Sequence, residues 1–169
     1  MSMIGCFLLV DDERLQRLMN EPEQVHDVCD DAYDAGDGVF ADVDKAWHCI
    51  HYLLTGSADA GDSPLNFVMS GGAPVGVEDV GYGPARAFRA VELAEIATAL
   101  ASIDHAKLAD RFDPQQMDRL EIYPDAGRWS EVDPRSQESF GYYSGAFDSI
   151  KSLVEHGVRS GAGLLVWLS

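Results

Sequence analysis

The chain has 169 residues, of which 46% are hydrophobic and 9% aromatic, and its formal net charge at pH 7 is −17. This size and composition predict one domain, residues 1–169, that buries about 70% of the surface its unfolded form would expose. The charge argues against nucleic acid and anionic membranes as partners, because both are bound by basic patches. The apolar runs fall far short of the ~20 residues of a membrane-spanning helix, so no membrane span is expected.

The negative charge is concentrated in the first half of the chain. Residues 1–80 contain 16 acidic and 3 basic residues, and Lys45 is the only lysine among them. An acidic surface of this kind can dock a basic protein partner, or it can simply keep the protein soluble. The sequence carries no signal for a particular oligomeric state.

The N-terminal region predicts a strand over residues 4–10. It is followed by a helix that is capped by Asp11 or Asp12, ends near Asn20 and buries its leucines. The segment lacks the basic start and small-residue cleavage site of a signal peptide, which predicts a cytoplasmic protein.

Three cysteines, Cys6, Cys29 and Cys49, match neither a redox pair nor a zinc framework. We expect them to be reduced and mostly buried. His26 precedes Cys29 by three residues and could form a nucleophilic pair with it. The neighbouring acidic residues would raise the pKa of the thiol, however, which disfavours such a pair.

A short helix is predicted over residues 22–33. The acidic, glycine-rich stretch 34–44 lacks the glutamate and the spacing of a calcium-binding loop, so it is interpreted as a connection. A longer helix follows, capped by Asp42 or Asp44 and ended by Gly56. One face of this helix should be buried, because apolar residues recur on it at helical spacing: Val43, Trp47, Ile50 and Leu54.

A second stripe of the same helix is polar and contains Asp44, His48, His51 and Thr55. A carboxylate that orients a partly buried imidazole can support acid/base chemistry near neutral pH, so Asp44 and His51 are candidate catalytic residues. Alternatively, the acid and the first histidine form an ordinary surface pair, and the second bonds a backbone carbonyl. A metal held by His48 and His51 would need ligands from elsewhere, so no metal site is predicted.

Ser63 and Pro64 predict a short helix over residues 65–69. The glycine-rich stretch 71–83 has neither a phosphate-binding loop nor a dinucleotide fingerprint, so no cofactor is expected and a flexible loop or lid is predicted. Tyr82, Arg86 and Arg89 lie in or after this loop. The arginines could bind an anion or neutralise nearby carboxylates.

Three helices are predicted next, over residues 91–102, 104–112 and 113–120. Glu121 to Pro124 should be extended, and Trp129 should lie in a loop.

The last helix is predicted to open at Asp133 and Pro134 and to end at His156, with Gly157 as its left-handed cap. Leu164 to Leu168 is too short an apolar run for a helix, which predicts a central strand. Strands at both ends with helices between them indicate an α+β fold: one compact domain with a small sheet against several helices.

Three segments resemble the YfbM-like family of small bacterial proteins. They are the start Met3–Gly5, the piece Glu121–Pro124 and, most specifically, a helix segment that contains Asp44, Lys45, Trp47, His51, Tyr52, Leu54, Thr55 and Gly56. The resemblance covers nearly the whole chain and implies a single α+β domain. The family is a group of unknown function, so it implies no catalytic or binding residue.

Two hypotheses of function follow from these features. In the first, the acidic face binds a basic protein partner or ligand. In the second, the protein is an enzyme or binds a small ligand at a site in which Asp44 orients His51, with Tyr123 as a third catalytic candidate. Ligand-binding candidates for that site are Lys45, Trp47, Thr55, Tyr82, Arg86 and Trp129. The second hypothesis requires His51 and Tyr123 to meet in one concave pocket.

Overall fold

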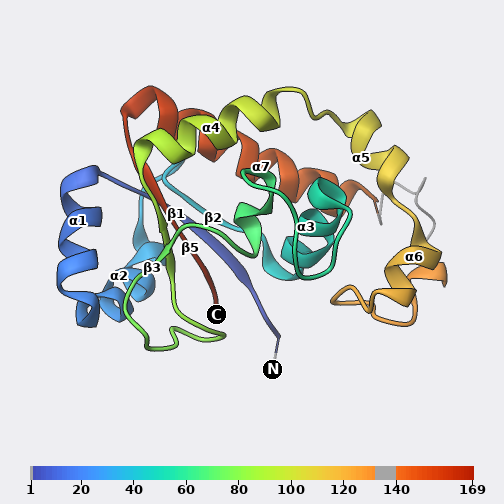
Figure 1. Ribbon diagram of the computed structural model, residues 1–169, viewed down its shortest axis with the longest axis horizontal. Helices are drawn as coiled ribbons and strands as arrows, with labels where there is room; N and C mark the ends of the chain where they lie inside the picture. The colour runs from blue at the N-terminus through green and yellow to red at the C-terminus, as the bar shows by residue number, and fades with distance from the viewer. Residues whose placement is uncertain (1, 132–139) are drawn as a thin grey trace.

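A five-stranded antiparallel sheet crosses the centre of the protein (Figure 1), seen in a computed structural model that describes residues 2–131 and 140–169. The strand order is β2-β1-β5-β4-β3. The strands are β1 (Gly5–Val10), β2 (Phe40–Asp42), β3 (Ala73–Pro74), β4 (Arg86–Phe88) and β5 (Gly163–Leu168). The first and last strands therefore lie side by side, and the predicted central strand at the end of the chain is confirmed.

The sheet separates two hydrophobic cores. Alternate residues of a strand point to opposite faces, so Phe7 of β1 enters one core while Cys6 and Leu8 enter the other. In β5, Val166 and Trp167 divide in the same way. Both faces are covered, which explains why these strands are continuous apolar runs without polar alternation.

Helices cover the two faces unequally. The smaller core lies under α1 (Asp12–Asn20) and α2 (Val25–Asp31), at the left of Figure 1. The larger core is built with the remaining helices: α3 (Trp47–Thr55), α4 (Ala90–Ala101), α5 (His105–Arg111), α6 (Pro114–Arg119) and α7 (Phe140–Ser160). The α+β architecture predicted from the sequence is confirmed.

Side-chain caps start several helices where they were expected. Asp11 accepts a hydrogen bond from the Arg14 N–H at the start of α1, and Asp104 does the same for Lys107 in α5. Asp113 caps α6, in which Pro114 takes the first position. These caps satisfy backbone donors that have no partner within the helix.

Two predicted connections contain strands. The stretch 34–44 includes β2, which pairs with β1, and the predicted loop 71–83 includes β3. These strands and β4 are only two or three residues long, so no alternation of polar and apolar residues marks them in the sequence. The short helix after Pro64 is present as a 3-10 helix, Leu65–Val68.

The predicted cap of the last helix was wrong. α7 continues to Ser160, and Gly161 takes the left-handed conformation with φ 68°. Gly157 instead lies inside the helix, where a Cβ would come within 2.6 Å of Leu9 and Leu93. Its missing side chain lets α7 approach both β1 and α4. The predicted helix start at Asp133 and Pro134 lies outside the described residues.

Candidate functional site

The three segments on which the family resemblance rests meet at one place, called here the motif junction. The Trp47 indole N–H donates to the Met3 carbonyl over 3.2 Å, and the Met3 N–H donates to the Tyr123 hydroxyl over 3.2 Å. Gly5 lies so close to α3 that a Cβ there would be 2.6 Å from the Trp47 Cβ. The junction thus joins the start of β1, the helix α3 and the 121–124 segment.

His48 is the polar centre of the motif junction. Its Nδ1 accepts the Tyr123 backbone N–H over 3.0 Å, so its Nε2–H is the donor to the Ala58 carbonyl at 2.9 Å. Its ring is stacked on that of Trp47, with centroids 4.9 Å apart. Burial lowers the pKa of His48, which keeps the ring neutral. Both ring nitrogens are therefore occupied in holding two loops against α3.

His51 is fully buried one turn further along α3. Its Nε2 lies 2.8 Å from the Ala60 carbonyl, while Nδ1 has no hydrogen-bond partner among the described residues. Burial lowers the pKa of His51 to about 4. A base with this pKa holds a proton too weakly to be effective near pH 7. His51 thus closes the core beneath the 57–60 loop.

Asp44 does not reach His51. The helix α3 begins at Trp47, and Asp44 lies before it in a 3-10 turn with φ 45°, so the predicted polar stripe does not extend back to the acid. Asp44 is exposed and accepts a hydrogen bond from the Tyr142 hydroxyl over 2.8 Å. The Lys45 N–H donates to the same hydroxyl over 3.2 Å. Tyr142 was not foreseen, because in the sequence it stands beside the apolar stripe of α7.

Thr55 and Trp129 have structural partners. The Thr55 hydroxyl donates to the His51 carbonyl over 2.8 Å and accepts the Ser57 N–H over 3.2 Å, which closes the end of α3. The predicted loop position of Trp129 is a 3-10 turn, Trp129–Glu131, and its side chain is fully buried. Its indole N–H donates to the Ile122 carbonyl over 2.6 Å. The tryptophan is thus a core residue, and it lines none of five cavities on the described surface.

Arg86 and Tyr82 come together, as the sequence allowed, on the rim of a hollow of about 230 Å³. The Arg86 guanidinium donates to the carbonyls of Phe67, Val68 and Ser70 over 2.7 to 2.9 Å. Burial lowers the pKa of Arg86 to about 10, so it stays charged at neutral pH. It caps the carbonyl end of the 3-10 helix 65–68, where a cation is favoured.

The required meeting of His51 and Tyr123 in a pocket is not found. Tyr123 contacts His48 through its backbone, and neither His51 nor Tyr123 lines any of five cavities on the described surface. Within residues 2–131 and 140–169 no three His, Cys, Asp or Glu side chains gather to hold a metal ion. Burial also raises the pKa of Cys29 to about 12, which disfavours a reactive thiolate.

The sequence matches the family described as "Domain of unknown function (DUF1877)" over residues 1–167. The chain belongs to the DUF1877 family. Protein YfbM of Escherichia coli (strain K12) is 30% identical over 128 residues, which cover 73% of this chain and 74% of YfbM. The crystal structure of YfbM, described as a protein of unknown function, matches with a TM-score of 0.68 and 25% identity over 98% of this chain and 99% of that one.

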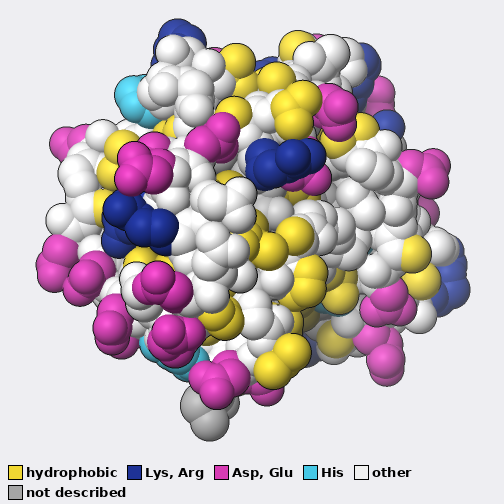
Figure 2. Space-filling view, turned by 60° about the vertical axis from the view of Figure 1, so that its left-hand side comes forward, with side chains coloured by type: hydrophobic (Ala, Val, Ile, Leu, Met, Phe, Trp, Pro, Cys, Tyr) yellow, Lys and Arg dark blue, Asp and Glu magenta, His cyan; other side chains and the backbone are white. Residues whose placement is uncertain are grey.

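A second region of this DUF1877 protein, apart from the motif junction, carries exposed charged side chains. Residues 21–44, called here the acidic segment, contain nine acidic residues and no lysine or arginine. All nine are exposed: Glu21, Glu23, Asp27, Asp30, Asp31, Asp34, Asp37, Asp42 and Asp44. Figure 2 shows the α1 and α2 side of the molecule, with acidic side chains spread over its surface. None of the described helices is long and apolar enough to span a membrane.

Proposed function

We propose that this protein binds a basic protein partner through the acidic segment. The observation that carries the proposal is the state of its nine carboxylates. All are exposed, and none forms an ion pair with a residue that the structure describes. Their charge is therefore available to a partner.

Electrostatic repulsion among these carboxylates supports the same proposal. Like charges held close together repel one another and destabilise the folded state. Lysine and arginine side chains of a partner would remove that repulsion, raise the association rate and exclude acidic competitors. Tyr33, which is 52% exposed, lies within the segment. Tyrosine is enriched in protein interfaces, because it combines a large apolar ring with a polar tip.

The three cysteines support action in the cytoplasm. Cys6, Cys29 and Cys49 are all free and buried. Thiols that persist without disulfides are typical of a reducing compartment.

The proposal can be tested by affinity capture from a cell extract at about 50 mM and about 500 mM salt, because exposed charge pairs are screened over this range. The test variant changes Asp27, Asp30, Asp31, Asp34 and Asp37 to Asn. The control neutralises five exposed acids elsewhere, Asp59, Asp62, Glu95, Asp110 and Glu155. Both variants change the net charge equally.

We expect a basic protein to be retained at low salt by the native protein and by the control, and to be lost from the test variant and at high salt. Equal retention by the two variants would show that the acidic segment is not the binding surface. Capture of no basic protein under any condition would refute the proposed function.

A further inference from the structure

A groove lies beside the acidic segment, between α1 and the β3 edge of the sheet. Its first part is a hollow of about 580 Å³ with α1 on one side and the β3–β4 pair on the other. Leu15, Met19, Ala73 and Ala87 supply its apolar lining. Met19 is a large hydrophobic residue and is nevertheless 37% exposed.

A second hollow of about 370 Å³ lies further along the same two chain segments. Pro22 follows α1 on one wall, and Val75, Gly76 and Val77 follow β3 on the other. Val77 is 92% exposed, so a large apolar side chain stands open to solvent at this end. Burial of such side chains by a partner is favourable, because it removes apolar surface from water.

The rim of both hollows is acidic. Asp12 and Glu92 line the first hollow, and Glu23 and Glu78 line the second. Arg89 is the one Lys or Arg among the residues that line the two hollows, and it lies 3.7 Å from the Glu92 carboxylate. Figure 2 shows apolar side chains between the acidic ones on this side of the molecule. An apolar floor with an acidic rim favours apolar side chains flanked by lysine or arginine.

The β3 edge of the sheet is poorly suited to bind a peptide as an additional strand. The Val75 N–H donates inward to the Ala85 carbonyl over 2.8 Å, so the alternate residue Pro74 directs its backbone outward. Proline has no N–H, and an edge strand that presents proline resists the addition of another strand. Recognition at this edge must therefore rely on side chains.

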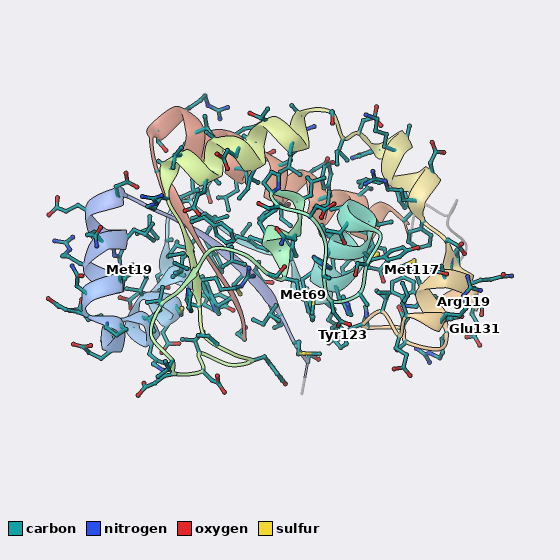
Figure 3. All side chains as sticks on the ribbon, in the orientation of Figure 1. Met19, Met69, Met117, Arg119, Tyr123 and Glu131 are labelled. Atoms are coloured by element: carbon teal, nitrogen blue, oxygen red, sulfur yellow. The ribbon has the colours of Figure 1, made fainter. Side chains whose placement is uncertain are left out.

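We propose that this groove is the docking site for a segment of the partner protein in which apolar side chains alternate with, or flank, lysine and arginine. The inference rests on the proposed function and specifies where and how the basic partner binds. A second copy of this chain is a poor occupant, because its net charge of −17 would be repelled by the rim. The groove is distinct from the motif junction, since Met19 and Tyr123 lie far apart in Figure 3.

Four synthetic peptides of equal length can test the chemistry: lysine with leucine, lysine with serine, glutamate with leucine, and serine with leucine. Fluorescence anisotropy at about 50 mM salt would measure their dissociation constants. We expect the lysine–leucine peptide to bind at least about tenfold more tightly than the lysine–serine peptide, because only the former fills the apolar floor. The two peptides without lysine should bind more weakly still.

Two exposed groove residues provide the matching variants, Met19→Lys and Val77→Lys. Both should weaken binding of the lysine–leucine peptide about tenfold or more by placing a cation in the groove. Val158→Lys is the control, since Val158 is 41% exposed on α7 and lines neither hollow. Its dissociation constant should stay within about twofold of the native value, as expected for a contact outside the site.

The outcomes separate the two proposals. If both lysine peptides bind equally and the groove variants bind like the control, the groove is refuted while a general acidic docking surface survives. If the glutamate–leucine or serine–leucine peptide binds best, the occupant is not basic and the groove proposal fails. If no lysine peptide binds even at low salt, the proposed function fails as well.

Discussion

The motif junction and the acidic segment differ in what their polar groups do. At the junction, Trp47, His48 and Tyr123 direct their donors and acceptors to other parts of the same chain. In the acidic segment, nine carboxylates are exposed without an ion-pair partner in the described structure, although Glu21, Asp42 and Asp44 accept hydrogen bonds. Residue type alone thus says little about function. A polar group is available to a ligand only when the fold has not already used its hydrogen bonds and charge.

The largest expected effect concerns the junction. Trp47→Ala should reduce the free energy of unfolding by about 3–5 kcal/mol, because it leaves a cavity where a buried ring held the start of β1. Trp47→Phe keeps an aromatic ring on His48 and should cost less. Urea unfolding followed by circular dichroism would measure both. A loss below about 1 kcal/mol for the alanine variant would mean that the junction is not a structural centre.

The two histidines of α3 offer a sharper contrast. His48→Leu should cost about 2–3 kcal/mol, because it leaves the Tyr123 N–H and the Ala58 carbonyl without partners. His51→Leu leaves only the Ala60 carbonyl unpaired and removes a buried acceptor that has no partner, so it should cost less. Equal costs in the same urea titration would contradict the assigned hydrogen bonds.

The stability of the fold should also decrease as the pH falls, because His48 and His51 are buried. Burial lowers the pKa of His51 to about 4 and also lowers that of His48, both from an ordinary value of 6.5. Between these values the unfolded state binds more protons, so stability is present above about pH 6.5 and is lost as the pH falls toward 4. The slope is at most about 1.4 kcal/mol per pH unit for each ring. Melting temperatures from pH 8 down to about 4 would measure the loss.

The matched control for the pH dependence is the double variant His48→Gln, His51→Gln. Its melting temperature should fall less over the upper part of that range, because it has no imidazole to protonate. If it has the same pH dependence as the native protein, groups other than these histidines are responsible.

The smallest expected effect concerns the acidic segment. We consider a triple variant with the substitutions Asp27→Asn, Asp30→Asn and Asp31→Asn. Each substitution should change the free energy of unfolding by no more than about 0.5 kcal/mol, since the three side chains are exposed. The change should be stabilising and largest at low salt, because the substitutions relieve repulsion. A large destabilisation that persists in high salt would mean that the carboxylates have structural partners.

The sequence predicted those features that depend on local chemistry. Caps at Asp104 and Asp113, the buried face with Trp47 and the two long strands all follow from side-chain periodicity or from single backbone donors. The strands β2, β3 and β4 were missed because they are only two or three residues long and have no local sequence pattern. They are strands because they pair with other segments of the sheet.

The candidate site was predicted less well, for a geometric reason. A helical stripe that joins Asp44 to His51 assumes regular helix from residue 44, but φ at Asp44 is positive and α3 starts three residues later. Burial also decided the roles of His48 and Trp129. It depends on segments that only the fold brings together, such as the Tyr123 backbone at His48 and the Phe112 and Tyr143 rings at Trp129. The groove could not be predicted at all, because its walls come from segments more than 50 residues apart.

The pairing of β1 with β5 also constrains how the protein folds during its synthesis. Gly5 pairs with Leu168 and Val10 with Gly163, so the two central strands come from opposite ends of this sequence. The ribosome makes β5 after every other element described here, and until then neither core has its central strand. Such distant contacts also slow folding, because a long loop must close before they form. We therefore expect nascent chains that end before residue 163 to expose the apolar face of β1 and to depend on chaperones.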